Sequence, residues 1–227
     1  MKNVIRALVI TWLSKASVEV GEKETKVLGD LLDTDCDHRS THINAQMNGL
    51  EISPSKPVGQ NLFWRRIFND KDIYSLIFDL CSSETVGRGE GQLDERQKSL
   101  AQARLLRLLP RIAILDFKAI STTNFPEIDS RYGSEGKAQG LLGFAALDMV
   151  DKEEDILMHL TLIDFFAHLL ESLSTISLDA TTMDYLKRLL RTATLDDTSL
   201  YKSLESLAMS PNSSPELVEL FTKLNDQ

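Results

Sequence analysis

The sequence predicts an all-α protein, and two observations support this prediction. Apolar residues recur at the three- and four-residue spacing of an amphipathic helix along most of the chain. Alternating runs of β-branched residues, which are typical of half-buried strands, are almost absent. We therefore expect helices that bury their apolar faces against other helices.

The N-terminal part predicts a helical hairpin followed by a polar segment. Apolar stripes at 4–13 and 27–32 lie on either side of Gly21, where we place the turn. The hairpin would occupy 1–33. Residues 34–60 are rich in Asp, His, Asn and Ser and carry two prolines near their end, so they predict a loop or linker.

The remaining residues, 61–227, alternate between apolar helical patterns and short polar connections. Pro110 should kink or end the longest pattern, and Pro215 suits the first turn of the last helix. Helical patterns are expected at 62–68, 73–80, 92–117, 141–149, 156–170, 183–190, 195–209 and 217–224, with a loop at 82–91 and irregular structure at 118–136.

Paired helices that recur at intervals of about 40 residues are typical of an α-solenoid of HEAT or armadillo type. The same pattern would also suit a single irregular helical bundle. We favour the solenoid, with an N-terminal hairpin at 1–33, a linker at 34–60 and HEAT/armadillo-like repeats over 61–227.

Charge and cysteine content exclude several classes of partner. The chain carries 25 Lys and Arg against 34 Asp and Glu, a net charge of −9, which opposes approach to nucleic acid or anionic lipid. Its apolar run at 4–13 contains Arg6 and is too short to span a bilayer. Two cysteines are too few for a disulfide framework or a four-thiolate zinc site. We expect a cytoplasmic protein, with the nucleus as a further location, and we expect no membrane or nucleic-acid partner.

No motif for nucleotide binding, nucleophilic catalysis or zinc hydrolysis occurs in the sequence. Cys36, His38 and His42 could share a metal with Asp35, but they have no second ligand cluster, so we favour loop roles. We predict a non-enzymatic protein without metal or cofactor. The alternative, an enzyme with scattered catalytic groups, would draw on Asp155, His159 and His168.

Two polar stripes are candidates for partner binding. Arg104, Arg107 and Arg111 share one face of the long helix, where they form either a solvated surface or a docking surface for an acidic partner. A second stripe lies on a later helix, opposite Ile156, Leu160, Ile163 and Phe166. Its members are Thr161, Asp164, His168 and Glu171. In a HEAT-like array both stripes could face one groove.

Three segments resemble the 26S proteasome non-ATPase regulatory subunit 5 family, and in particular its fungal members. They are residues 154–166, which follow the Gly-Leu-Leu at 140–142, residues 62–74, and residues 101–113. The resemblance covers most of the chain from Gly59 to about Leu190. Since family members are considerably longer, it implies a truncated member.

The resemblance implies a HEAT/armadillo-like assembly chaperone. Such a protein binds the C-terminal domain of one proteasomal ATPase subunit and assists assembly of the base of the 19S regulatory particle. The alternative function is a generic armadillo/HEAT adaptor with another protein ligand.

Overall fold

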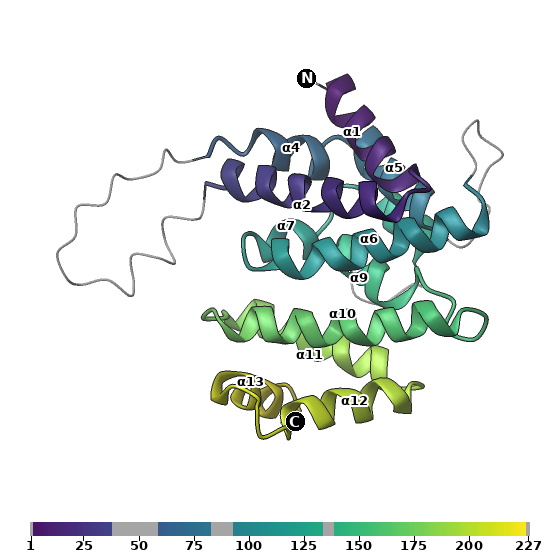
Figure 1. Cartoon of the computed structure of the whole chain (residues 1–227). Helices are drawn as coiled ribbons and strands as arrows, with labels where there is room; N and C mark the ends of the chain where they lie inside the picture. Colours follow the sequence, from purple (N-terminus) through teal and green to yellow (C-terminus); the bar gives the residue numbers. More distant parts are fainter. Residues whose placement is uncertain (1, 38–58, 83–92, 134–138, 226–227) are drawn as a thin grey trace.

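The all-α prediction is confirmed. A computed structural model describes residues 2–37, 59–82, 93–133 and 139–225, and in these residues it contains twelve helices and no strand. The helices are stacked in layers, with the N-terminus at one end of the stack and the C-terminus at the other (Figure 1).

The helices have the following bounds. In chain order they are α1 (Lys2–Ser14), α2 (Val18–Asp35), α4 (Leu62–Phe68), α5 (Lys71–Cys81), α6 (Glu95–Ala113), α7 (Phe117–Ser121), α8 (Pro126–Tyr132), α9 (Gly140–Leu147), α10 (Ile156–Ser174), α11 (Ala180–Thr194), α12 (Thr198–Ala208) and α13 (Pro215–Asn225).

Most helix starts are set by a polar side chain that accepts a hydrogen bond from the first turn. This cap satisfies one of the backbone N–H groups that have no partner within the helix. At α6, Asp94 and Gln97 form a reciprocal capping box. The capping residues are Ser17, Asp70, Asp94, Asp116, Asp155, Asp179 and Asp197.

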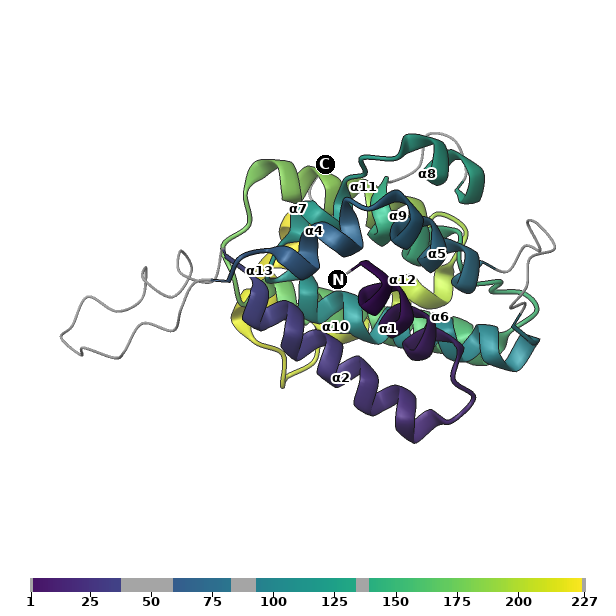
Figure 2. The same cartoon turned by 90° about the horizontal axis from the view of Figure 1, so that it is seen from above.

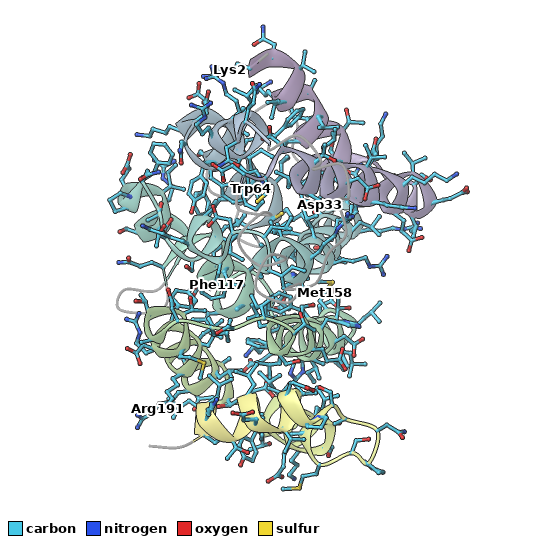
Figure 3. The ribbon with its side chains drawn as sticks, turned by 90° about the vertical axis from the view of Figure 1, so that its left-hand side faces the viewer. Lys2, Asp33, Trp64, Phe117, Met158 and Arg191 are labelled. Carbon is cyan, nitrogen blue, oxygen red and sulfur yellow. The ribbon has the colours of Figure 1, made fainter. Side chains whose placement is uncertain are left out.

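The long helices α2, α6 and α10 lie one below the other on one side of the stack (Figure 1). Helices α12 and α13 continue the series beyond α10. Seen from above, α4, α7, α9 and α11 lie on the other side (Figure 2). The side view follows the same order of layers, from Lys2 at one end, past Trp64, Phe117 and Met158, to Arg191 near the other (Figure 3).

One contiguous apolar core runs through all the layers, from Ile5 of α1 to Leu224 of α13. Its largest fully buried side chains include Trp12, Tyr74 and Phe166. Helix α1 contacts α5 and α6 as well as α2. The predicted hairpin at 1–33 therefore forms as a pair of helices but shares its core with the rest of the chain.

Several predicted boundaries differ from the structure. The turn between the first two helices lies at 15–17, and Gly21 is buried inside α2. Helix α6 continues past Pro110 to Ala113, so the proline does not end it. The irregular segment at 118–136 contains the end of α7 and all of α8. Most of the predicted linker, residues 38–58, and the glycine-rich part of the loop at 82–91 lie outside the described residues.

Among the described helices, α10 is long and apolar enough to cross a membrane by length and composition. A core helix passes the same test. In this structure α10 packs between α6 on one side and α12 and α13 on the other, and it buries Met158, Phe166 and Leu170.

Candidate partner-binding surface

Arg104, expected in an exposed basic stripe, is buried with only 6% of its surface exposed. Its guanidinium donates hydrogen bonds to three main-chain carbonyls where α1 ends and α2 begins. Nη1 lies 2.8 Å from the oxygen of Trp12 and 3.3 Å from that of Leu13, and Nη2 lies 2.9 Å from that of Ser17. Burial lowers the pKa of Arg104, and the nearby Glu24 opposes this shift.

The other two arginines of the stripe also bind α2. Arg107 pairs with Glu22 at 2.6 Å, and Arg111 pairs with Asp30 at 2.5 Å and donates to the carbonyl of Lys26. The prediction of an open docking surface is wrong for Arg104, which is buried. It stays a prediction for Arg107 and Arg111, whose side chains are 65% and 38% exposed. Their face lies against α2 because each guanidinium finds an acceptor there.

Two glycines of α2 make room for these arginines. A Cβ atom built on Gly21 would lie 2.0 Å from Nε of Arg104, and one on Gly29 would lie 2.4 Å from Nη1 of Arg111. The glycines are eight residues apart and so lie on the same face of α2. Glycines spaced in this way on one amphipathic helix were a sequence signal for close packing that the sequence analysis missed.

The second polar stripe is open to solvent for most of its length. Asp164, His168 and Glu171 are exposed on α10, whereas Thr161 is half-buried and donates to the carbonyl of Leu157 at 2.9 Å. Arg107 and Arg111 of α6 pair with α2, and no hydrogen bond or ion pair joins the two stripes within the described residues.

The apolar residues at the start of α10 are placed differently from the prediction. Ile156 and Leu160 were expected to be buried opposite the polar stripe, but they are 72% and 54% exposed, and Leu157 is 74% exposed. Ile163 is half-buried and Phe166 is fully buried, as expected. The first turns of α10 bury Met158 but leave Ile156, Leu157 and Leu160 exposed, so an apolar surface stays uncovered.

Of the three candidate catalytic groups, Asp155 and His159 have separate partners and His168 is exposed. Asp155 caps α10 and accepts a hydrogen bond from Ser99 at 3.1 Å. His159 lies 2.8 Å from a carboxylate oxygen of Asp197, and His168 is exposed. Among the described contacts, no hydrogen bond or ion pair joins the side chains of these three residues.

Asp197 is the centre of a polar cluster that connects α10 to α12. Its carboxylate is 7% exposed, caps α12 at the N–H of Leu200, and also lies 3.4 Å from Nζ of Lys152. Burial raises the pKa of Asp197. The hydrogen bonds from Leu200 and His159 and the charge of Lys152 outweigh burial and leave this pKa below its ordinary value.

A cavity of about 600 Å³ lies between α7, α8, α9 and α11. Two polar side chains of its wall, Asp129 and Tyr185, already have partners. Asp129 accepts from the N–H of Gly140 at 2.7 Å and from the hydroxyl of Tyr74, and Tyr185 donates to the carbonyl of Gln139. Burial raises the pKa of Asp129 above its ordinary value, and the hydrogen bond from Gly140 opposes this shift. These contacts hold the start of α9 in place.

The described residues contain no group of three or more His, Cys, Asp or Glu side chains that could hold a metal ion. Cys36 is buried in the core, while His38 and His42 lie outside the described residues. No family model, curated protein or solved structure matches the chain.

Proposed function

We propose that the chain is a non-enzymatic scaffold built as a HEAT/armadillo-like solenoid that binds another protein. The observation that carries the proposal is the parallel course of α2 and α6. Arg104 donates to the carbonyl of Ser17, which caps α2, and Arg107 and Arg111 pair with the later residues Glu22 and Asp30 of α2. Ser99 of α6 meets Asp155, the cap of α10, at 3.1 Å.

A parallel course of equivalent helices supports repeats over an up-and-down bundle. In such a bundle, helices that are neighbours in sequence pack antiparallel around one shared core. In a solenoid each layer adds a helix in the same direction and contacts only adjacent layers. Here α6 separates α2 from α10, and α12 and α13 lie beyond α10 (Figure 1). The uneven helices α7 and α8 would then be insertions between repeats.

The partner we propose is the C-terminal domain of an ATPase subunit of the proteasome base, with a role in assembly of the 19S regulatory particle. The support is the resemblance of residues 62–74, 101–113 and 154–166, which correspond to α4 and α5, to α6, and to the start of α10. The mechanism would be steric, because a domain held by the scaffold cannot make its later contacts. Such a protein would act in the cytoplasm or nucleus.

The direct test uses biolayer interferometry to measure binding of the purified full chain to the isolated C-terminal domain of each base ATPase subunit. We expect one domain to bind with a Kd of about 1 μM or tighter and the others about tenfold more weakly or worse. If no domain binds, the proteasome assignment is wrong.

The adaptor alternative is tested by affinity purification of the tagged full chain from cells. Recovery of a different protein in stoichiometric amount, without ATPase subunits, would favour a generic HEAT/armadillo adaptor. A chain that is recovered alone would contradict both versions of the scaffold.

A further inference from the structure

The first turns of α10 carry an exposed apolar surface, which we call the α10 patch and define as Ile156, Leu157 and Leu160. These side chains are 72%, 74% and 54% exposed. They lie within one turn of each other and so form a single surface. Clustered exposure of large aliphatic side chains is unusual at the surface of soluble proteins and marks interaction sites.

Acidic side chains surround the α10 patch. Glu153 and Glu154 precede it, and Asp164 follows one turn after Leu160. All three are exposed, and no ion pair to them occurs within the described part of the chain. Lys152, the only cation of the connection 151–155, is engaged by Asp197 at 3.4 Å.

The connection between α11 and α12 also carries an exposed apolar side chain next to an exposed carboxylate. Leu195 is 75% exposed and is followed by the exposed Asp196. Both directly precede Asp197, which His159 of α10 contacts at 2.8 Å. The connection between α11 and α12, which carries this apolar side chain and this carboxylate, is joined to the start of α10 through Asp197.

We propose that the α10 patch binds a protein segment that combines apolar side chains with Lys or Arg, such as one face of a basic amphipathic helix. The apolar side chains would cover Ile156, Leu157 and Leu160, and the cations would neutralise Glu153, Glu154 and Asp164. The proposal rests on the protein-binding function above and narrows it to one surface and one partner chemistry.

The charges favour this occupant over two others. In a symmetric dimer through the α10 patch, the acidic residues of the two copies would face each other, and each copy already carries a net charge of −9. A bilayer surface with anionic lipids would meet the same repulsion. A basic segment meets complementary charge and apolar area together.

The test measures fluorescence anisotropy of labelled model peptides titrated with the full chain. One peptide is an amphipathic helix of Leu on one face and Lys on the other, and its isomer carries Glu in place of Lys. We expect the Leu/Lys peptide to bind at least about tenfold more tightly than the Leu/Glu isomer, with affinity that falls as salt rises.

Two variants locate the binding. Leu157→Ser with Leu160→Ser and, separately, Glu153→Lys with Glu154→Lys should each weaken the Leu/Lys peptide about tenfold. The matched controls, Val27→Ser on α2 and Glu216→Lys on α13, alter exposed residues of the same kinds elsewhere and should leave affinity unchanged. Thermal melts identify any variant that fails to fold.

Four results would overturn the proposal. The first is equal binding of the two peptides, or none; the second is binding that both patch variants leave intact. The third is a concentration-dependent dimer, seen by analytical ultracentrifugation, that the leucine variants abolish. An ATPase domain that still binds the patch variants would refute the α10 patch but leave the scaffold function standing. If the Leu/Lys peptide binds but no ATPase domain does, the α10 patch proposal stands and the proteasome assignment is wrong.

Discussion

Arg104 of α6 donates a 2.8 Å hydrogen bond to the main-chain carbonyl of Trp12, 92 residues earlier in the chain. The contact joins the end of α1 to the middle of the central helix. The last carbonyls of a helix lack hydrogen-bond donors within the helix. A buried cation that donates to these carbonyls therefore stabilises the helix end. Arg104, which was predicted to lie at the surface, is therefore a buried residue with a structural role.

Arg104→Ala should lower the free energy of unfolding by about 2–4 kcal/mol, because it removes a buried charged donor and leaves three carbonyls without it. Arg104→Lys should recover only part of the loss, since an ammonium lacks the planar fork that reaches separate acceptors. Urea denaturation measures both. The control is Arg107→Ala, which breaks an exposed ion pair and should cost less than about 1 kcal/mol. Equal losses at the two sites would contradict this account.

Gly21→Ala and Gly29→Ala should differ in effect although both place alanine in the same helix. Alanine favours a helix over glycine by about 1 kcal/mol. At Gly21 the new Cβ displaces the buried guanidinium of Arg104, so we expect a net loss of about 1–3 kcal/mol. At Gly29 it meets Arg111, whose pair with Asp30 is partly exposed and can move, so the net change should be near zero. Thermal unfolding of the two variants compares them directly, and a stabilised Gly21→Ala would show that Arg104 is dispensable.

The cluster around Asp197 should make stability depend on pH in a defined direction. Its pKa in the folded protein lies below the ordinary 3.8, so the unfolded chain takes up a proton first as the pH falls. The stabilisation from Asp197 is therefore complete above about pH 5 and is lost as the pH falls below 3.8 through the folded pKa.

Asp197→Asn keeps the cap of α12 but removes the charge, so it should lose stability above about pH 5 and approach the parent protein in acid. Chemical denaturation at a series of pH values measures the gap between the two proteins. Asp196→Asn, at the exposed neighbouring position, is the control and should show no such trend. A gap that widens in acid would mean that the carboxylate of Asp197 is not the stabilising form.

Cys36 and Cys81, the two cysteines of the chain, should resist a thiol reagent in the folded protein. They are 3% and 0% exposed, and burial raises the pKa of the Cys81 thiol, which suppresses the reactive thiolate. With Ellman's reagent we expect almost no reaction in buffer and two thiols per chain in urea. Rapid reaction of one thiol in buffer would show local opening of the layer that contains it.

The sequence was sufficient for the helices that have strong local signals. Asp70 marks the start of α5 and the apolar spacing at 156–170 marks α10, because caps and helical periodicity act within a few residues. Boundaries without such signals were less accurate. Gly21 resembled a turn residue, but the turn lies before it, and the glycine is required inside α2 for the approach of Arg104.

The candidate site was less predictable, since exposure depends on what packs against each face. Arg104 and Arg107 lie on one face of α6 and have the same residue type, yet one is buried and the other is exposed. At α10 the sequence is apolar on most sides of the first turns, so spacing alone did not distinguish the buried Met158 from the exposed Leu157.

The net charge of −9 is a property of the composition. The sequence by itself also determined that the chain is helical and located most of its helices to within a few residues. These properties follow from interactions between residues close together in the chain. Only the tertiary structure decided that the arginines of α6 bind α2, that α2 and α6 run parallel, and that the α10 patch stays open. Those properties depend on contacts between residues 38 to 92 positions apart, which a local pattern does not specify.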